Sequence, residues 1–273
     1  MAILNNFIIE LESLTYKIKD KKLINNISFQ VEAGDMISIV GPNGSGKSTL
    51  VRLMSSELSP YYGQIKFHNK TISDWNPLKL ALYRSVLYQS SNLSFSFTVS
   101  DIIKMGFYPS EISDNKKNYN KICEELLDIF DLSGYFDRIY TTLSGGEKQR
   151  VQLARVIAQI WSDQQFRDKL LILDEPTSYL DIKHQLSLFN FLENLNRKGL
   201  TIIMVLHDLN HAILKSNKVA MLKDSALVDF GKVEELMNTD QLKEVFDVNL
   251  KLLEDNKLNS TFIAFSDKGL DNE

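Results

Sequence analysis

The sequence predicts a mixed α/β fold, in which a largely parallel β-sheet core is combined with an antiparallel β part and a helical segment. Three short, mostly apolar stretches are typical of strands covered on both faces, as in a parallel sheet. They are MISIV at 36–40, LLILD at 170–174 and TIIMVL at 201–206. Two further stretches, FIIELESLTY at 7–16 and GQIKFHN at 63–69, alternate apolar and polar residues. This alternation indicates antiparallel strands with one face in water.

Helical patterns occupy the middle of the chain, from about residue 98 to residue 161. Thr98 and Asp101 form an S/T-x-x-D helix start. Apolar residues on one face of a later helix recur at helical spacing. They are Leu153, Ile157, Ile160 and Trp161. The last two dozen residues predict a short strand pair followed by a frayed end.

Composition limits the class of protein. The chain has 273 residues, is 44% hydrophobic and carries a net charge of −4. Proteins that bind nucleic acid through its phosphates usually carry a basic excess, so nucleic acid is not expected as a partner. The single cysteine, Cys123, excludes an internal disulfide framework and fits a reducing cytoplasm. Neither a long apolar run nor a signal-peptide pattern is present, so we expect neither a membrane span nor secretion.

The stretch GPNGSGKS, residues 41–48, matches the phosphate-binding pattern G-x-x-x-x-G-K-[ST] in full. A predicted strand precedes it and a predicted helix follows it. Glycines let backbone N–H groups turn inward around phosphate oxygens, and the helix adds its positive dipole end. Lys47 would reach the β- and γ-phosphates, Ser48 would ligate magnesium, and Thr49 would meet the α-phosphate. The predicted nucleotide contacts are Gly41, Pro42, Asn43, Gly44, Ser45, Gly46, Lys47, Ser48 and Thr49.

An acidic pair, Asp174 and Glu175, ends the predicted strand LLILD. Burying such a pair is costly unless a cation or hydrogen bonds compensate its charge. Magnesium would do so, with Asp174 as its ligand, directly or through water. Glu175 would then orient and deprotonate the attacking water.

A second glycine-containing motif, LSGGEKQR at 143–150, precedes a predicted helix. Ser144 and Glu147 stand in the S-x-x-E relation of a capping box. Gly145 and Gly146 each weaken a first helical turn by up to about 1 kcal/mol, and helix structure alone gives no reason for them. Exposed N–H groups for a second phosphate contact would give one. Since the chain has its own phosphate loop, we expect this contact to serve a nucleotide held by another chain.

Together, GPNGSGKST, LSGGEKQR, LLILDEP and a histidine after TIIMVL resemble the ATP-binding subunits of ABC transporters. The resemblance extends from about residue 7 to residue 249. It implies a P-loop NTPase of ABC type that hydrolyses ATP with Mg²⁺ and couples hydrolysis to transport. It also implies an ATP-binding domain at 1–249 and a short C-terminal extension at 250–273. The domain would have a core lobe at about 1–89 and 162–249, and an inserted helical lobe at about 90–161.

Further roles are implied position by position. Tyr16 matches the aromatic residue that stacks on adenine, and Gln89 matches the glutamine that touches magnesium and senses the γ-phosphate. Asp181 matches the aspartate that contacts the opposite subunit, and His207 matches the histidine that holds the γ-phosphate. Tyr179 departs from the family, which usually has alanine there. The expected catalytic residues are Lys47, Glu175 and His207, and the expected metal ligands are Ser48, Gln89 and Asp174.

The resemblance implies a homodimer with two ATP molecules. Each motif occurs once, so Ser144, Gly145, Gly146 and Glu147 of one subunit would close over ATP held by the other subunit. Two multi-span membrane permease subunits, and indirectly a substrate-binding protein, are the expected partners. The expected location is the cytoplasmic face of the inner cell membrane, as a peripheral protein.

The stretch TVSDIIKMGFYP at 98–109 resembles T-V-x-x-x-V-x-x-G-R-x-P, a pattern of importers for iron chelates, heme and cobalamin. SNLSFSFTV at 91–99 and the spacer SDQQFRDK at 162–169 resemble the heme branch. We therefore expect a heme importer. A ferric-siderophore or cobalamin importer is the alternative, and a soluble ABC ATPase that remodels a protein complex is the alternative from another class.

Four aromatic residues lie within this region although no chemistry is expected there. They are Phe95, Phe97, Phe107 and Tyr108. Phe97 is expected in the core, and the rest is expected to help form a groove for a helix of the membrane subunit. Charging Phe107 or Tyr108 is then expected to uncouple transport while ATP hydrolysis persists.

Overall fold

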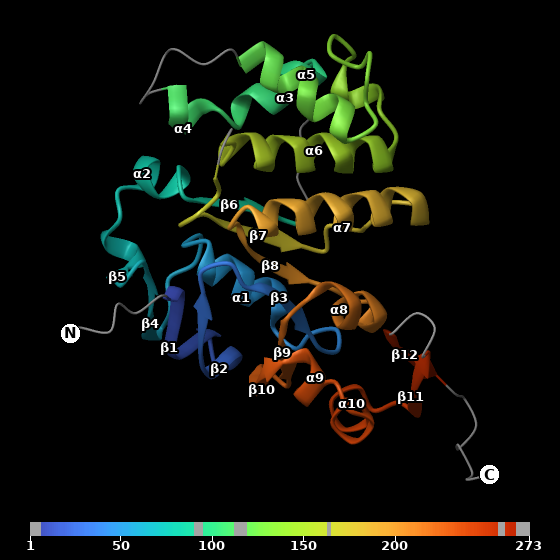
Figure 1. Ribbon diagram of the computed structural model, residues 1–273. Helices are drawn as coiled ribbons and strands as arrows, with labels where there is room; N and C mark the ends of the chain where they lie inside the picture. Colours follow the sequence, from blue (N-terminus) through green and yellow to red (C-terminus); the bar gives the residue numbers. More distant parts are fainter. Residues whose placement is uncertain (1–6, 90–94, 112–118, 163–164, 256–259, 266–273) are drawn as a thin grey trace. The chain divides into compact units, whose positions relative to one another are not determined.

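The computed structural model describes residues 7–89, 95–111, 119–162, 165–255 and 260–265 (Figure 1). These residues form two compact units. The first unit combines two separate stretches of the chain, Met1–Ser73 and Ile203–Glu273. The second is the continuous stretch Asp74–Ile202. The lobe boundaries expected from the motifs, after residues 89 and 161, remain a prediction.

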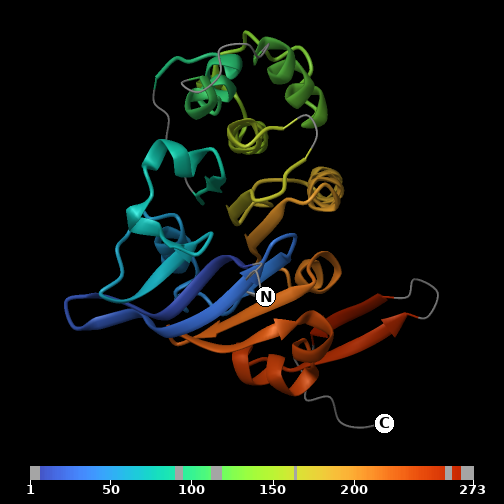
Figure 2. The ribbon, with the colours of Figure 1, turned by 60° about the vertical axis from the view of Figure 1, so that its left-hand side comes forward.

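An antiparallel sheet forms one part of the first unit. Its strands are β1 (Phe7–Ile18), β2 (Lys21–Glu32), β4 (Tyr62–Phe67) and β5 (Lys70–Thr71), in the order β2-β1-β4-β5. All neighbouring pairs run antiparallel, and Figure 2 shows β1 and β2 as two long blue strands. The side chains of Ile9, Leu11 and Leu14 are almost fully buried in the core. The predicted antiparallel part is confirmed, but Ile8 and Glu10 are buried as well, so the expectation that one face of β1 lies in water is wrong over residues 8–11.

A second set of strands surrounds β3 in the first unit. It contains β3 (Met36–Val40), β8 (Thr201–Val205), β9 (Lys218–Lys223) and β10 (Ala226–Lys232), in the order β10-β9-β3-β8. β3 runs parallel to β9, and every residue of β3 and β8 is buried, as their uninterrupted apolar sequences predict. The Met36 N–H donates to Asn217 Oδ1 at 2.8 Å, which fixes the start of β3. The helices of this unit are α1 (Lys47–Met54), α8 (Leu209–Lys215), α9 (Val233–Leu236) and α10 (Thr239–Phe246).

The C-terminal strand pair predicted from the sequence is present in the first unit. β11 (Leu250–Asp255) and β12 (Ser260–Phe265) pair antiparallel and are drawn in red in Figure 2. The side-chain amide of Asn210 on α8 forms hydrogen bonds with both backbone groups of Ile263 on β12, the same groups that a neighbouring strand would bind. The Ile263 N–H donates to Asn210 Oδ1 at 2.6 Å, and Asn210 Nδ2 donates to the Ile263 carbonyl at 3.3 Å.

The second unit contains most of the helices. Its elements are α2 (Pro77–Ala81), β6 (Arg84–Leu87), α3 (Val99–Met105), α4 (Tyr108–Glu111), α5 (Tyr119–Ile129), α6 (Gly145–Gln159), β7 (Leu170–Asp174) and α7 (Ile182–Arg197). β6 and β7 run parallel. Thr98 and Asp101 form a complete capping box at the start of α3. The mixed α/β fold with a helical middle is therefore confirmed.

The aromatic stretch divides between core and surface, which corrects one prediction. Phe107 is 1% exposed, and its ring centroid lies 4.6 Å from that of Tyr119. It packs against the start of α5, so the expectation that it faces a membrane partner is wrong. Tyr108 and Phe95 are exposed, whereas Phe97 is partly buried. The residues of SNLSFSFTV before Phe95 lie outside the described residues.

Two expectations from composition can be compared with the structure. The Cys123 side chain is buried on α5, and burial raises the pKa of its thiol to about 11. Across the described ranges, every helix is too short or too polar to cross a bilayer.

Candidate nucleotide-binding site

The loop at 41–46 joins β3 to α1 and brings its backbone very close to neighbouring strands. Gly41 and Gly46 have φ angles of 153° and 103°. A Cβ at Gly41 would lie 2.1 Å from the carbonyl oxygen of Leu222, and a Cβ at Gly46 would lie 2.5 Å from that of Leu23. Both clashes would be with backbone carbonyl oxygens, which cannot rotate away as a flexible side chain could. The loop therefore requires glycine at both positions, and its path is fixed by β9 and β2.

Lys47 folds back over the loop that precedes it. Its Nζ donates to the carbonyl oxygens of Gly41 at 2.8 Å and Pro42 at 2.9 Å, and the residue is buried. Ser45 is also buried, and its Oγ has no hydrogen-bond partner among the residues that the structure describes. A buried polar atom without a partner is costly. An ammonium and a hydroxyl directed at one loop provide the hydrogen bonds that a phosphate group accepts.

The start of α1 adds backbone donors to this loop. Gly46 is the N-cap residue, and in the described part of the chain no side chain caps this helix end. The first N–H groups of a helix lack partners within the helix, and the dipole there favours an anion. Ser48 and Thr49 lie in this first turn and are partly exposed. The arrangement has the properties of a phosphate site, as GPNGSGKST predicts.

Two other predicted contacts lie in the first unit. Tyr16 is a partly buried residue of β1. His207 is exposed and follows the end of β8, where the Leu206 N–H donates to the Ile39 carbonyl at 3.2 Å. That bond holds the segment leading to His207 against β3, the strand that also leads into the phosphate loop. The roles of Tyr16 and His207 remain predictions.

The acidic pair lies in the second unit, at the end of β7. Asp174 is 2% exposed, and Glu175 follows it with a left-handed backbone conformation, φ 52°. Ser178 Oγ donates to Glu175 Oε2 at 3.4 Å. A carboxylate buried as deeply as Asp174 calls for a compensating charge or hydrogen bonds. Gln89, exposed two residues after β6, is the other predicted metal ligand in this unit.

The donor set fits magnesium better than a metal held wholly by protein. Within the described ranges, no three His, Cys, Asp or Glu side chains gather into a metal-binding group. Mg²⁺ usually takes only one or two protein oxygens and fills its other positions with phosphate and water. Ser48 in the first unit, and Asp174 and Gln89 in the second unit, carry oxygen atoms of the kind that the ion takes, and their role as ligands remains a prediction.

The LSGGE motif begins α6 with both hydrogen bonds of a capping box. The Ser144 N–H donates to Glu147 Oε2 at 2.7 Å, and the Glu147 N–H donates to Ser144 Oγ at 3.4 Å. The Tyr135 hydroxyl donates to Glu147 Oε1 at 2.8 Å. These bonds, with that from the Ser144 backbone largest, lower the pKa of Glu147 to about 2. The first turn of α6 is thus rigidly held and carries a carboxylate.

The two glycines of this motif face Tyr179, which corrects the expectation that structure gives no reason for them. A Cβ at Gly146 would lie 2.8 Å from the Tyr179 carbonyl oxygen. A Cβ at Gly145 would lie 3.5 Å from the Tyr179 ring, which is ordinary contact. Gly146 therefore permits a close backbone approach inside the subunit. Tyr179 is 78% exposed and has a left-handed conformation, φ 65°.

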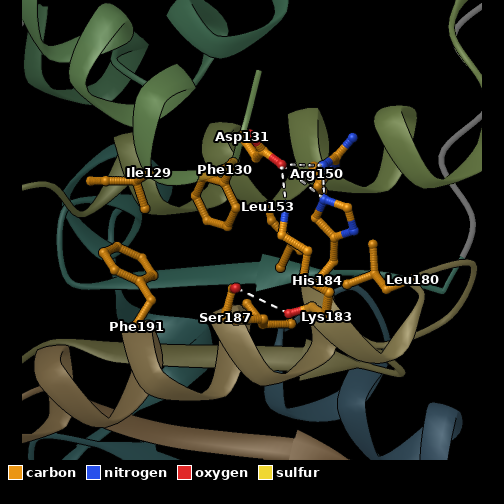
Figure 3. Close-up of a pocket in the computed structure, with 11 residues that line it drawn as sticks. Ile129, Phe130, Asp131, Arg150, Leu153, Leu180, Lys183, His184, Ser187 and Phe191 are labelled. Atoms are coloured by element: carbon orange, nitrogen blue, oxygen red, sulfur yellow. Dashed lines mark hydrogen bonds and ion pairs between the residues drawn. The ribbon is translucent and has the colours of Figure 1, made fainter. Parts of the chain in front are cut away.

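A side-chain cluster surrounds His184, a residue that lies outside the motifs found in the sequence. Asp181 caps α7 by accepting the His184 N–H at 2.9 Å, and its Oδ1 lies 2.7 Å from His184 Nδ1. Arg150 of α6 and Asp131, which follows α5, reach the other ring nitrogen, as Figure 3 shows. The D-x-x-H spacing at a helix start was the available signal, because it places both side chains on one turn.

Comparison with known proteins identifies the family. Residues 24–178 match the family model described as ABC transporter. A protein of Chelativorans sp. (strain BNC1), named Hemin import ATP-binding protein HmuV, is 39% identical over 244 residues. That match covers 89% of this chain and 93% of the relative.

Solved structures agree in fold. A chain of a metal-chelate type ABC transporter in an inward-facing conformation matches with TM-score 0.77 and 25% identity, covering 96% of this chain and 97% of that chain. A dimeric ATP-binding cassette in a post-hydrolysis state, bound to ADP and Pi, matches with TM-score 0.71 and 25% identity. It covers 82% of this chain and 98% of that chain. The family match extends over more than half of the chain and includes the phosphate loop, the LSGGE motif and the acidic pair, so this protein belongs to the ABC transporter family and is one of its nucleotide-binding ATPases.

Proposed function

We propose that this chain is the energy-coupling ATPase subunit of a bacterial heme importer. The observation that carries the proposal is the 39% identity, over 89% of the chain, to a protein named for hemin import. The structural neighbour described as a metal-chelate type transporter supports the same class of cargo. The alternatives are a ferric-siderophore or cobalamin importer, and a soluble ABC ATPase that remodels a protein complex.

In this proposal the phosphate loop binds ATP and the acidic pair completes the chemistry. Lys47 and the N–H groups of the loop hold the β- and γ-phosphates, while Tyr16 stacks on adenine. Ser48, Gln89 and Asp174 would hold Mg²⁺, which would supply positive charge to neutralise the transferring phosphoryl group. Glu175 takes a proton from the attacking water, and His207 orients the γ-phosphate. Such sites act mainly by positioning and charge stabilisation.

The proposed active unit is a homodimer with two ATP molecules. Ser144, Gly145, Gly146 and Glu147 are exposed or partly exposed at the start of α6, so their polar groups are available to a partner subunit. The related dimeric cassette supports this assembly. The proposed interaction of Asp181 with the opposite subunit agrees with its exposure at the start of α7.

A groove in the second unit suits the proposed membrane partner. It has a volume of about 280 Å³ and is lined by residues of β6, α3 and α6 together with Tyr88 and Gly106. Met105 at its edge is 40% exposed, and Tyr108, which starts α4 just beyond it, is 59% exposed. Gln159 Nε2 donates to the carbonyl oxygens of Ala81 and Arg84 at 2.9 Å, which joins α6 to the strand side of the groove.

We infer that this groove receives a helix of a permease subunit. Apolar side chains at its edge would bury against that helix, and the partly buried Arg84 and Arg155 would donate hydrogen bonds to its acidic or carbonyl oxygens. Burial lowers the pKa of Arg84 to about 10, still well above neutral, so its charge remains. The protein would thereby lie on the cytoplasmic face of the membrane without spanning it.

The proposal is tested by co-purifying the chain with the permease encoded beside it and measuring ATP hydrolysis in proteoliposomes. Heme-loaded binding protein should stimulate hydrolysis, and siderophore-loaded or cobalamin-loaded binding proteins should not. Stimulation by one of the other cargoes would favour the first alternative. Failure to bind any permease would favour the remodelling ATPase.

A further inference from the structure

His184 lies at the centre of a polar cluster built from three segments of the second unit: the turn after α5, helix α6 and the start of α7. The cluster consists of Asp131, Arg150, Asp181, Lys183 and His184. Asp131, Arg150, Lys183 and His184 form the polar end of a cavity of about 260 Å³ between α6 and α7, shown in Figure 3. The other end of the cavity is apolar, where Phe130 and Phe191 pack edge to face with centroids 5.5 Å apart. The imidazole therefore finds its hydrogen-bond partners within the cluster.

The partners of the two ring nitrogens decide where the hydrogen atoms lie. Arg150 Nη1 is within hydrogen-bond reach of His184 Nε2. A guanidinium has only donors, so Nε2 must be the acceptor and the neutral ring carries its hydrogen on Nδ1. Nδ1–H then donates to Asp181 Oδ1 at 2.7 Å. A protonated ring would carry a hydrogen on Nδ1 as well, so the bond to Asp181 persists in both forms.

Asp131 provides the alternative partner for Nε2. Its Oδ2 lies 3.3 Å from His184 Nε2, 3.2 Å from Lys183 Nζ and 3.9 Å from Arg150 Nη1. The hydrogen bonds from Lys183 and then His184 lower the pKa of Asp131. A neutral ring accepts from Arg150, whereas a protonated ring donates to Asp131. The ring is anchored at Nε2 in either state, which leaves Nδ1 directed at Asp181.

Asp181 is held at one oxygen and remains open to a partner. The backbone N–H and the ring Nδ1 of His184 both contact Asp181 Oδ1, and the Asp181 side chain is 65% exposed. These two bonds, the backbone one first, lower the pKa of Asp181 and keep it ionised. An exposed carboxylate normally samples several rotamers, and fixing it in advance reduces the entropy lost when it binds.

We propose that His184 is a positioning residue that orients Asp181 for contact with the opposite subunit and connects it to the LSGGE helix through Arg150. The inference rests on the proposed dimer and deepens it. Arg150 lies on α6, the helix that begins with Gly145. Movement of α6 toward a partner-bound nucleotide therefore moves the anchor of the ring that orients Asp181. The His184 imidazole therefore links the two proposed dimer contacts, Asp181 and the LSGGE motif at the start of α6.

Two substitutions at His184 separate the two ends of the ring. His184→Asn places an amide nitrogen where Nδ1 lies, so it keeps the donor to Asp181 and loses the link to Arg150. His184→Gln extends its amide to the position of Nε2, so it keeps an acceptor for Arg150. It loses the side-chain hydrogen bond to Asp181 Oδ1. Steady-state ATP hydrolysis is measured for each as a function of protein concentration. Lys183→Ala is the matched control, because Lys183 lies beside His184 and donates to Asp131, while its effect on Asp181 is electrostatic and not a hydrogen bond.

For His184→Gln, the protein concentration that gives half-maximal activity should rise about tenfold, which corresponds to about 1.4 kcal/mol. The KM for ATP at saturating protein should be unchanged. His184→Asn keeps the hydrogen bond to Asp181 but loses the anchor to Arg150, so its rise should be clearly smaller than that of His184→Gln. Lys183→Ala should stay within about twofold of wild type. Wild-type behaviour of His184→Gln, or an equal loss in His184→Asn, would overturn the inference.

Ring ¹⁵N chemical shifts in the dilute, nucleotide-free chain test the geometry without the dimer. A neutral ring protonated at Nδ1 is expected, and a neutral ring protonated at Nε2 alone would refute the link to Asp181. If wild-type activity per subunit did not depend on protein concentration, the proposed dimer would fail. The ¹⁵N result would still decide the role of His184 in holding Asp181.

Discussion

Glu175 has a backbone conformation that residues other than glycine seldom adopt, with φ at 52°. Such conformations cost about 1–3 kcal/mol and persist where the surrounding structure imposes them, often at functional sites. β7 ends at Asp174, and the turn at Glu175 separates the two carboxylates of the pair. Asp174 stays buried, while Glu175 becomes partly exposed. One carboxylate is thus suited to a metal ion and the other to a water molecule.

Glu175→Gln should lower kcat for ATP hydrolysis by at least about 100-fold, because the amide cannot accept the proton of the attacking water. The affinity for ATP should be unchanged. Phosphate release and calorimetric titration measure the two quantities. Glu193→Gln on α7 is the control, since Glu193 lies outside the predicted site and pairs with Arg197 at 3.9 Å. Turnover close to wild type in Glu175→Gln would refute the assigned role.

Gly145 and Gly146 are adjacent but differ in the space beside them. Gly146→Ala should reduce the free energy of unfolding by about 1–3 kcal/mol, because its Cβ would meet the Tyr179 backbone. Gly145→Ala should be neutral, or stabilising by up to about 1 kcal/mol, since alanine favours the helix. Urea unfolding of the nucleotide-free chain compares them. Equal effects of the two substitutions would contradict the contact with Tyr179.

Among the elements, α6 depends most clearly on a charged cap. The pKa of Glu147 is about 2 in the folded chain, against 4.5 for an ordinary glutamate. A carboxyl with a depressed pKa stabilises the fold when ionised, and that contribution disappears as the pH falls from about 4.5 through about 2. The start of α6 should therefore weaken in acid.

Glu147→Gln should lower stability at pH 7, and its difference from wild type should shrink toward pH 3. Urea unfolding at pH 7, 5 and 3 measures this difference. Glu125→Gln on α5 serves for comparison, because Glu125 is exposed and forms a surface pair with Lys121 at 3.8 Å. A difference that stays constant with pH would show that the carboxylate charge does not stabilise the cap.

Between α3 and α4, two adjacent aromatic residues differ in role. Phe107 is buried and supports the fold, whereas Tyr108 is exposed and can contact a partner. Phe107→Asp should destabilise the chain by at least about 3 kcal/mol, because it buries a charge and empties the space against Tyr119. Tyr108→Asp should leave stability within about 0.5 kcal/mol, as expected of an exposed site. It should nevertheless abolish stimulation of ATP hydrolysis by the permease in proteoliposomes. Full stimulation in Tyr108→Asp would remove this residue from the proposed groove.

At the scale of the whole molecule, local sequence patterns predicted the helices and strands. They did not predict contacts between residues that are far apart in the sequence. Uninterrupted apolar runs identified β3, β7 and β8, and the glycine–lysine spacing located the phosphate loop, because both depend on neighbouring residues. The burial of Phe107 depends on Tyr119, and the need for Gly146 depends on the backbone of Tyr179. The cluster of Arg150 and His184 likewise joins helices far apart in sequence. Such contacts are set by packing and leave no local signature.

The divided first unit has a consequence for the order in which the protein is made. Gly41 lies against Leu222, and Met36 is bound by Asn217, 181 residues later. A growing chain on the ribosome therefore exposes the phosphate loop long before the strand that supports it has been synthesised. The second unit, Asp74–Ile202, is continuous and emerges whole in the meantime. Since domains tend to fold as units during synthesis, the half of the protein that begins the sequence is the last to be completed.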